Sequence, residues 1–541
     1  MKRLSLISWG FIAFAVILLF RLFFLQVISH DVLSAKGDAQ RLYSVTLEEP
    51  ERGAIMDRNG SSVTADKKTY SLLVVPFLVD DPVLFSQKVG DTFDVSKDKL
   101  ESKIIGINTE GKEIRKQPFI LKGDLTFEEM DRANKLGEDG LFVVPYQNRY
   151  YRDFLAQHLV GSLKWNGDTW VGISGLERIY DDVLSEGIDD KMSILIDEKN
   201  RVITSDNYFN DDNKTMAMVK TTIDPGIQKV SESALEGHSG AVVVLDSTNC
   251  DVLALVSSPE YDPYFMTELK SEDVYMNKAL SSYPPASMFK IFIAAVALEE
   301  GIVAPESTFF CDGSYSIDYG NDVSCWNEDG HGFITFEDSL ACSCNPVYVK
   351  TALDLGPSRI KEAFALWELN QDELLGYPLD DLSNISFSDS SNAAVSNIGL
   401  GENGVCMTPL TVAKMINVVA SGGMMYTPRV VTEVYDNKGM LSDSIEISDP
   451  KRVLSEENAG ILVSMMAKTF QNGTAASLHL GSFHIAGKTG SSETGSVWIG
   501  GFFPYDDPQY TVVVLVTDGE SGAADAGPIM KKICAYLGNL S

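Results

Sequence analysis

The sequence has few basic residues for its length, few histidines, and no low-complexity tracts or internal repeats. Lysine and arginine number 44 against 76 aspartate and glutamate residues in 541, which gives a formal net charge of −32. Nucleic-acid binding needs a basic face, so no nucleic-acid partner is expected. Hydrophobic residues make up 44% of the chain, which indicates a globular protein with room for more than one domain.

Histidine and cysteine are too scattered to predict a metal centre. The six histidines show no metal-ligand pairing, and none lies in a recognisable Ser-His-Asp context. Cys342-Ser-Cys344 lacks the spacing and the histidine partners of a zinc site. We therefore expect no metal and no cofactor, and a serine enzyme built on this chain would use lysine as its base.

An apolar segment runs from Leu4 to Ile28 with a single charge, Arg21. It is long enough to span a bilayer, and Lys2 and Arg3 before it favour a cytoplasmic N-terminus. The run is too long for a cleaved signal peptide, and no Ala-x-Ala site follows it. We expect a cytoplasmic tail at residues 1–3 and a single-pass anchor at 4–28 in the lipid bilayer of the cell membrane, with the rest of the chain extracellular.

All seven cysteines follow the anchor, so Cys311 and Cys325 would face an oxidising exterior. Cys311 and Cys325 bracket Asp312–Ser324, a segment with hairpin-like alternation. A disulfide between them is one expectation. Two buried free thiols are the other, and the sequence leaves both open.

The chain after the anchor divides into two regions with different patterns. Residues 36–215 are mixed in character: Asn59-Gly60 predicts a hairpin turn, Tyr70–Val75 a strand and Phe127–Leu136 a charged helix. This region carries no constellation that suggests chemistry. Residues 219–541 begin with a helix near Pro225 and a hairpin. They continue mostly helical to about residue 422 and end in three strands and a helix.

The strands of the second region predict its architecture. They are Gly240–Asp246, Asp251–Ser257, Ser482–Gly490, Val497–Phe502 and Tyr510–Thr517, and the closing helix is Ala523–Leu537. Because these strands are apolar on both faces, helices must cover the sheet on both sides. We expect an α+β fold: an antiparallel five-stranded sheet covered by helices, with a helical subdomain and a mixed α/β domain before it.

The stretch from Tyr283 to Glu300 organises this second region. After two prolines an apolar helix begins, with Ser287 at its start and Lys290 three residues on, so both side chains share one face. Burial would lower the pKa of Lys290 and favour the neutral amine, a general base beside a nucleophile. Taken alone, such a pair is more often a helix cap and a solvated lysine.

Two further segments favour the catalytic interpretation of Ser287 and Lys290 over the helix cap. Ser343-Cys344-Asn345 lies at a helix end just before a proline, and Lys488-Thr489-Gly490 follows an alternating strand. Separately they would be a helix cap and a strand end. A phosphate-binding loop over Gly481–Thr489 is excluded, because five residues separate its glycines where the motif needs four.

Ser-x-x-Lys, Ser-x-Asn and Lys-Thr-Gly in this order resemble the motifs of penicillin-binding proteins and serine β-lactamases. Further segments resemble class B penicillin-binding proteins, the monofunctional transpeptidases of the bacterial cell wall. They are Arg52–Gly60, Gly172–Glu177, Thr221–Gln228, Gly401–Leu410 and Gly473–Ala475. The resemblance covers nearly the whole chain from Arg21 onward.

The chain departs from the family pattern at three positions. Ala286 stands where glycine usually precedes the nucleophile. Cys250 replaces a hairpin glycine, and we expect Asn249 to take the positive-φ position there. Ser491 replaces a threonine and keeps its hydroxyl.

The resemblance implies a membrane-anchored D,D-transpeptidase that cross-links peptidoglycan stem peptides and is a target of β-lactams. Ser287 would attack the terminal D-Ala-D-Ala, Lys290 would take its proton, and Ser343 would relay that proton to the departing amine. The substrate-binding residues would be Asn345, Lys488, Thr489, Gly490 and Ser491. Backbone N–H groups of Ser287 and Ser491 would form the oxyanion hole.

Two alternatives share this fold. A β-lactamase needs a deacylating acid, but the Glu-x-x-Leu-Asn motif has Leu366 at the acid position, and Glu368 is out of register and read as a solvated helix residue. A non-catalytic scaffold or β-lactam sensor is disfavoured because all three motifs are chemically intact.

The resemblance also implies a partner and a cellular role. Residues 36–215 resemble the family's non-catalytic, dimerisation-like pedestal, and 219–541 its transpeptidase domain. The pedestal lacks an acidic constellation for glycosyl transfer, so a membrane glycosyltransferase partner is expected. Ser-Cys-Asn-Pro at 343–346 favours the division and sporulation types.

Overall fold

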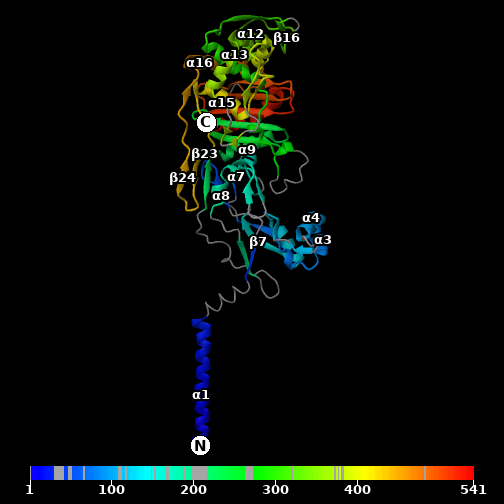
Figure 1. The fold of residues 1–541 in the computed structure, drawn as a ribbon, viewed down its shortest axis with the longest axis vertical. Coiled ribbons are helices and arrows are strands. Elements are labelled where there is room, and N and C mark those ends of the chain that lie inside the picture. Colours follow the sequence, from blue (N-terminus) through cyan, green and yellow to red (C-terminus); the bar gives the residue numbers. More distant parts are fainter. Residues whose placement is uncertain are drawn as a thin grey trace. The chain divides into compact units, whose positions relative to one another are not determined.

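The structure is a computed structural model, and it describes the chain in segments. The described residues are 2–29, 42–46, 52–64, 68–107, 113–115, 118–123, 125–147, 149–150, 154–165, 170–186, 191–195, 216–261, 272–318, 321–370, 373–375, 377–378, 383–480 and 483–540. They group into two compact units (Figure 1). Unit 1 consists of Met1–Glu51, Asp66–Tyr151 and Gly187–Lys214, and unit 2 of Arg52–Ala65, Arg152–Glu186 and Thr215–Ser541.

These units interleave along the chain, whereas the predicted domains, 36–215 and 219–541, do not. Residues 52–65 and 152–186 precede the predicted boundary but group with the residues after it. Strand β2 (Ala54–Met56) explains why, because it pairs in parallel with β11 (Met218–Thr221) and joins the sheet β2-β11-β23-β24. The division into two sequence domains stays a prediction.

The N-terminal segment is helical, as the apolar run predicts. Helix α1 spans Lys2–Phe23, and a π-helical turn, η1, continues it over Phe24–Ile28. In the part of the chain that the structure describes, no helix is both long and apolar enough to cross a membrane. The anchor at residues 4–28 therefore stays a prediction.

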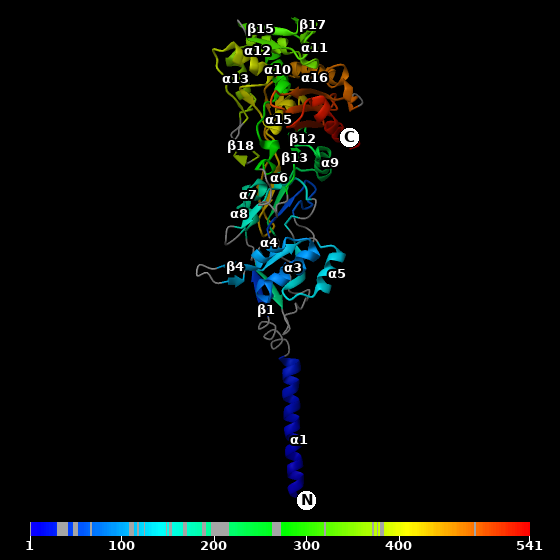
Figure 2. The ribbon, with the colours of Figure 1, turned by 90° about the vertical axis from the view of Figure 1, so that its right-hand side faces the viewer.

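Unit 1 is built on the antiparallel sheet β6-β3-β7. Its strands are β3 (Lys68–Val74), β6 (Phe119–Lys122) and β7 (Leu141–Gln147), and its helices are α3 (Pro82–Phe93), α4 (Lys97–Ile104) and α5 (Phe127–Leu136) (Figure 2). Apolar residues of the sheet and the helices, among them Leu72, Phe85 and Leu100, form one buried cluster. The helix predicted at Phe127–Leu136 is confirmed, and a capping box between Thr126 and Glu129 fixes its start.

The five-stranded sheet of unit 2 confirms the predicted arrangement. Its order is β13-β12-β28-β27-β26, and every pair is antiparallel. The strands are β12 (Gly240–Asp246), β13 (Val252–Ser258), β26 (Ala486–Ser491), β27 (Val497–Phe503) and β28 (Tyr510–Val516). Strand β26 begins at Ala486 and not at the predicted Ser482. His484 has a left-handed φ of 51°, which is incompatible with an extended strand at that residue.

Helices cover both faces of this sheet, as expected from strands that are buried on both sides. On one face α9 (Pro225–Leu235) and α17 (Gly527–Leu537) share a buried core with the strands. On the other face α15 (Pro409–Ala420) packs against β12, β27 and β28. A side chain at Gly500 would lie within 2.9 Å of Ile416 and Met288, so this face is closely packed.

The turn between β12 and β13 corrects one expectation. Cys250 itself has a φ of 64°, whereas Asn249 does not take the left-handed conformation. The Asn249 side chain instead accepts a hydrogen bond from the Asp251 N–H at 2.8 Å. The expectation that Asn249 takes the positive-φ position of this turn is therefore wrong.

A helical subdomain with two small two-stranded sheets lies between the early and late strands. Its helices are α10 (Lys290–Glu299), α11 (Phe336–Ala341), α12 (Asn345–Leu355), α13 (Pro357–Leu366), α14 (Asn392–Leu400) and α16 (Glu456–Gln471). Strand β14 (Thr308–Cys311) pairs with β17 (Gly332–Thr335), and β15 (Ser314–Asp318) pairs with β16 (Asn321–Ser324). The second pair is the hairpin that the alternation between Cys311 and Cys325 predicts.

Shorter elements complete the two units. In unit 2 they are β8 (Leu163–Trp165), β9 (Trp170–Gly172), α6 (Gln157–Val160), α7 (Gly175–Ile179), α8 (Asp181–Leu184), β18 (Glu373–Leu374), β19 (Tyr377–Pro378), β20 (Asn384–Ile385), β21 (Val405–Cys406), β22 (Met424–Met425), β23 (Val431–Tyr435), β24 (Leu441–Ser444) and β25 (Lys451–Arg452). In unit 1 they are β1 (Leu42–Thr46), β4 (Ile105–Ile107), β5 (Glu113–Arg115) and β10 (Lys191–Leu195).

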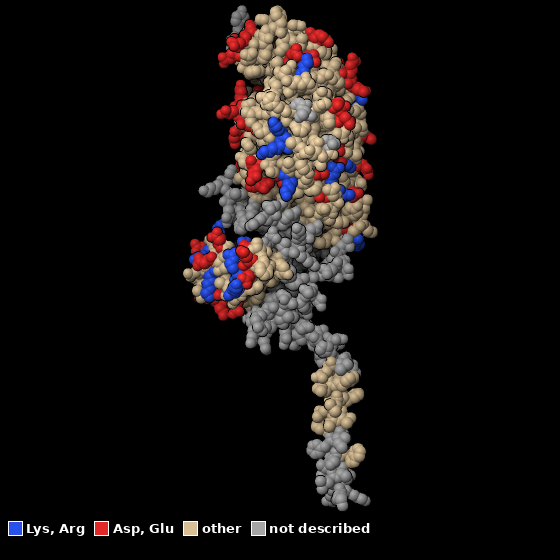
Figure 3. Space-filling model, turned by 180° about the vertical axis from the view of Figure 1, so that it is seen from behind, with Lys and Arg blue, Asp and Glu red and all other residues tan. Residues whose placement is uncertain are grey.

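The surface reflects the acidic composition. In Figure 3 aspartate and glutamate side chains are spread over the drawn face of unit 2, and lysine and arginine gather in small groups between them. No continuous basic face is visible from this side among the described residues.

A buried ion pair joins two segments of unit 2, Arg52–Ala65 and Arg152–Glu186, that are far apart in the sequence. The Arg52 guanidinium donates to Glu177 at 3.1 Å and to Asp181 at 2.6 Å. The Arg52 and Glu177 side chains are almost inaccessible to solvent, at 1% and 0%. Breaking a buried pair by removing one partner leaves an uncompensated charge and costs about 3–5 kcal/mol.

We expect Glu177→Ala to lower the free energy of unfolding by about 3 kcal/mol or more, measured by urea denaturation. Asp354→Ala is the matched control, because it breaks the Lys350–Asp354 pair at 2.8 Å, whose side chains are 45% and 40% exposed. That change should cost no more than about 1 kcal/mol. Equal effects of the two substitutions would contradict a structural role for the buried pair.

Candidate active site

Ser287 lies in a tight turn that leads directly into a buried helix. A 3-10 turn, η6 (Ala286–Phe289), is followed by α10, which starts at Lys290. Ala286 has a φ of 48° and its N–H donates to the Gly401 carbonyl at 2.8 Å. Alanine therefore holds the left-handed conformation that favours glycine, and the turn is kept despite the departure from the family pattern.

Lys290 connects two of the three sequence motifs. Its side chain is fully buried, and Nζ donates to the Ser343 carbonyl at 2.9 Å, to Ser343 Oγ at 3.3 Å and to Asn345 Oδ1 at 2.7 Å. The ammonium position also lies 5.5 Å from the centre of the Tyr348 ring. Ser-x-x-Lys and Ser-x-Asn, more than fifty residues apart in the chain, thus meet at one amine.

Burial controls the protonation of this amine. Desolvation lowers the pKa of Lys290 from 10.5 to about 8, against the opposing effect of Cys344, Cys325 and Glu402. Lys488 is also fully buried, and its pKa is lowered well below its usual value, first by desolvation and then by the charge of Lys290. Burial therefore lowers the pKa of Lys290 toward neutral pH, as the sequence predicts, and about pH 8 is the point above which the neutral amine predominates.

The Ser-x-Asn motif occupies the junction between α11 and α12. Ser343 has a left-handed φ of 57°, and Asn345 is the first residue of α12. The Asn345 Nδ2 donates to the Ser324 carbonyl at 3.0 Å. The amide is thus held from both sides, by Lys290 on its oxygen and by the hairpin strand β16 on its nitrogen.

The Lys-Thr-Gly motif lies on the edge strand β26. The Lys488 Nζ donates to the Thr489 carbonyl at 2.8 Å, and the Thr489 hydroxyl shares a 2.6 Å hydrogen bond with Thr474. A side chain at Gly490 would lie 3.3 Å from the Pro285 carbonyl and 3.4 Å from the Met288 nitrogen. Glycine here lets the edge strand pack against the turn that carries Ser287.

The Ser491 and Ser287 hydroxyls complete the set of predicted positions. Ser491 Oγ accepts from the Gly522 N–H at 3.2 Å. Within the described part of the chain, no hydrogen bond joins the Ser287 hydroxyl to Lys290 or Ser343. Catalytic hydrogen bonds are often long without substrate and shorten in the complex, so this arrangement is compatible with a nucleophile and its base.

Two polar residues near the site were not singled out from the sequence. Glu402 is half-buried, its carboxylate accepts from the Ser492 hydroxyl at 3.0 Å, and burial raises its pKa. Thr474 contacts Thr489 as described above. Both belong to segments that resemble the family, Gly401–Leu410 and Gly473–Ala475, and that resemblance was the available signal.

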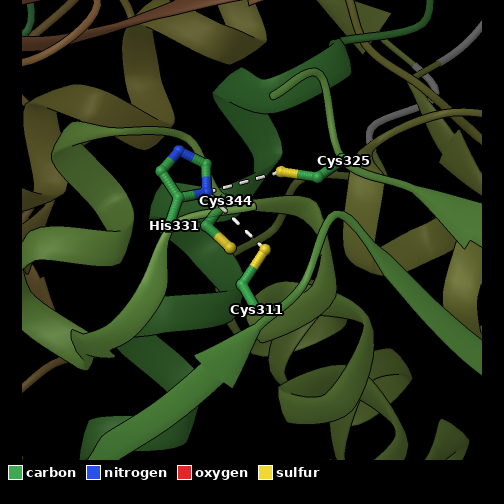
Figure 4. Close-up of side chains that lie close together, drawn as sticks. All are labelled: Cys311, Cys325, His331 and Cys344. Carbon is green, nitrogen blue, oxygen red and sulfur yellow. Dashed lines mark hydrogen bonds between the residues drawn. The ribbon is translucent and has the colours of Figure 1, made fainter. Parts of the chain in front are cut away.

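The cysteines beside the site correct a further expectation. All seven are free thiols, so the Cys311–Cys325 disulfide is not formed and the alternative of two buried thiols is confirmed. The ligand atoms of Cys311, Cys325, His331 and Cys344 all lie within 4.8 Å of one another (Figure 4). The β14–β17 pairing brings His331 to the cysteines, a grouping that the sequence spacing does not indicate, and the absence of a metal site stays a prediction.

The fold and the three converging motifs define the serine acyl-transferase architecture of penicillin-binding enzymes. The transpeptidase domain model of the penicillin-binding proteins matches residues 240–535, and the penicillin-binding protein dimerisation domain model matches 47–215. The first match alone covers more than half of the chain. The chain therefore belongs to the penicillin-binding proteins, and the two domains together place it in class B.

Similar proteins match over most of the chain. It is 27% identical over 526 residues to stage V sporulation protein D of Bacillus subtilis, covering 90% of this chain and 77% of that protein. It is 24% identical over 618 residues to peptidoglycan D,D-transpeptidase MrdA of Haemophilus influenzae, covering 99% and 92%. A solved D,D-transpeptidase domain of a peptidoglycan glycosyltransferase from Eggerthella lenta has a TM-score of 0.64 at 20% identity, covering 91% and 99%, which shows a shared fold.

The lowered pKa of Lys290 predicts a pH dependence of acylation by penicillin. Below pH 8 most Lys290 amines are protonated and cannot accept the serine proton, so the rate should rise about tenfold per pH unit and level off above about pH 8. Fluorescent penicillin bound to the protein, followed over time at each pH, measures this rate. A rate that is constant from about pH 6 to about pH 9 would contradict Lys290 as the base.

Proposed function

We propose that the protein is a peptidoglycan D,D-transpeptidase that acts through an acyl-enzyme on Ser287. The observation that carries this proposal is the buried Lys290, whose amine contacts Ser343 and Asn345 within one turn of Ser287. A desolvated amine next to a serine at a helix start is the arrangement of a general base and its nucleophile. The relatives named peptidoglycan D,D-transpeptidase support the substrate.

The chemistry follows from these contacts. Ser287 Oγ attacks the carbonyl of the penultimate D-alanine while its proton passes to the neutral Lys290 Nζ. The peptide C–N bond then breaks, and the proton moves through Ser343 Oγ to the amine of the departing D-alanine. An amine of a second stem peptide attacks the acyl ester, forms the cross-link and returns the proton to Ser287.

The remaining predicted positions would bind the substrate and stabilise its negatively charged groups, the terminal carboxylate and the oxyanion. Lys488 and Thr489 would bind the terminal carboxylate beside the edge strand, and Asn345 would position the substrate amide. A bound carboxylate favours the charged form of Lys488, which burial otherwise opposes. Backbone N–H groups of Ser287 and Ser491 would stabilise the oxyanion.

The structure offers little support for the β-lactamase alternative. Glu368 lies in a turn after α13, with a φ of 49°, and not in a helix as expected. Its carboxylate lies 3.5 Å from Lys451, and both side chains are more than 40% exposed. Leu366, at the position of the deacylating acid, is itself 45% exposed. Persistence of the acyl-enzyme therefore separates the two functions.

We expect labelled penicillin to attach to Ser287 and to remain attached for many minutes, as shown by intact mass and peptide mapping. Ser287→Ala and Lys290→Arg should both abolish labelling, because arginine cannot deprotonate to act as a base. Lys350→Arg, at an exposed position on α12, is the matched control and should label normally. Label on another residue, or rapid turnover to penicilloate, would refute the transpeptidase proposal.

We further propose that residues 4–28 anchor the protein in the cell membrane, with the catalytic domain outside. Large apolar side chains on α1 support this, since Trp9, Ile17 and Phe20 are 71%, 65% and 70% exposed. The small residues of this segment, Gly10, Ala13 and Ala15, would permit close packing against another membrane helix. A multi-span glycosyltransferase is the expected partner, because cross-linking is useful beside the enzyme that makes the glycan. The Ser-Cys-Asn-Pro motif and the similarity to a sporulation protein support a division or sporulation role.

Replacing residues 4–28 with an unrelated apolar helix of the same length should keep the protein in the membrane fraction but release the glycosyltransferase partner. The measurement is co-purification from detergent extracts, with the unchanged chain as control. If the exchanged protein still co-purifies and supports growth, the segment is a tether without a packing role.

A further inference from the structure

Four side chains in unit 2 meet at one point beside the Ser-x-Asn motif. Cys311 ends β14, Cys325 follows β16, His331 precedes β17, and Cys344 is the N-cap of α12. The pairing of Cys311 with Gly332 across β14 and β17 places His331 next to the first cysteine. Figure 4 shows the three sulfur atoms and one imidazole nitrogen, His331 Nδ1, close together.

The distances agree with a tetrahedral metal site. His331 Nδ1 lies 3.7 Å from Cys311 Sγ and 3.5 Å from Cys325 Sγ. Around a zinc ion with Zn–S of about 2.3 Å and Zn–N of about 2.0–2.1 Å, tetrahedral angles place sulfur and nitrogen ligands about 3.6 Å apart. The two separations in the structure match this spacing, and all pairs of ligand atoms lie within 4.8 Å.

The surroundings fit a structural ion. The three cysteines are buried, at 1% exposure for Cys311, 3% for Cys325 and 0% for Cys344, and His331 is half-buried. Trp326 covers the imidazole in an edge contact with ring centres 5.6 Å apart. Three cysteines and one histidine fill four coordination positions, which is the donor set of closed zinc sites.

We propose that Cys311, Cys325, His331 and Cys344 bind one thiophilic divalent cation, Zn²⁺ in the first place. Binding forms three Zn–S bonds and one bond to His331 Nδ1, and the thiol protons pass to solvent. No electrons are transferred. The imidazole Nε2 would carry the ring proton, as required when Nδ1 is the ligand.

The position of the ion gives it a function. Cys344 lies between Ser343 and Asn345, the two residues that contact Lys290. Cys325 follows Ser324, whose carbonyl accepts from the Asn345 amide at 3.0 Å. An ion bound at the cluster would fix both segments that hold Asn345, so it is a clamp for the active-site motif. This role rests on the proposed function, whereas metal binding does not.

The first test is metal content. The full-length protein is purified in detergent under reducing conditions, without chelator, and zinc is measured by mass spectrometry of the metal. We expect about one zinc per chain, and far less in Cys325→Ala and His331→Ala. Cys534→Ala is the matched control, because it removes a buried thiol of the closing helix α17 and should keep the zinc.

The second test reads the ligands directly and does not depend on the variants folding. Replacing zinc by Co²⁺ in the unchanged protein should give thiolate-to-cobalt charge-transfer bands. A protein that stays free of metal after incubation with Zn²⁺, a cobalt spectrum without thiolate bands, or a disulfide among the three cysteines in non-reduced peptide maps would each overturn the proposal.

The clamp is tested by the rate of penicillin acylation. Removing zinc with a chelator should slow labelling of Ser287 at least about tenfold, and added Zn²⁺ should restore it. Unchanged labelling after zinc loss would overturn the clamp. Absence of labelling in the zinc-loaded protein would instead count against the proposed function, so the two failures are distinguishable.

Discussion

The active-site architecture depends on keeping a lysine amine out of water. Lys290 has no access to solvent, and its three acceptors all come from the Ser-x-Asn segment. Leaving a buried amine without partners would cost several kcal/mol, so the amine holds the junction of α11 and α12 against α10. The same burial lowers its pKa to about 8. Burial of Lys290 therefore both holds the α11–α12 junction against α10 and lowers the pKa of the amine.

The sheet supports this arrangement by close approach of backbones. Gly490 lets the edge strand lie against the turn that carries Ser287, and Gly500 lets Met288 and Ile416 pack onto the sheet. Ala286, the residue before the nucleophile Ser287, adopts a left-handed backbone conformation. Its N–H remains bonded to the Gly401 carbonyl, which fixes the turn from the outside. Small residues thus position the nucleophile relative to Lys488 and Thr489.

The parts of the fold that depend on local pattern could be predicted from the sequence. The early and late strands of the sheet, the helix at Phe127–Leu136 and the grouping of the three motifs all follow from periodicity or from motif order. The positive φ of Cys250 could not be assigned, because the choice between it and Asn249 depends on how the turn packs.

Contacts between segments far apart in the sequence could not be predicted either, because they too depend on tertiary packing. His331 lies in a loop whose proximity to Cys311 is set by strand pairing, and no spacing rule along the chain reveals it. Arg52 and Glu177 are separated by 125 positions and meet in one buried ion pair. Both cases show that tertiary pairing, rather than local propensity, decides which polar side chains share a site.

The strand order of the sheet also has a consequence for how the protein is made. Strand β12, near residue 240, takes its second neighbour, β28, from residues 510–516. While the ribosome synthesises the intervening chain, the β12 edge of the apolar β12–β13 hairpin is unpaired. An unpaired apolar edge can pair with another chain and cause aggregation. Chaperones or rapid packing of α9 onto the hairpin must protect this edge until the last strands emerge. The five-stranded sheet is therefore completed only after residues 510–516 have been synthesised.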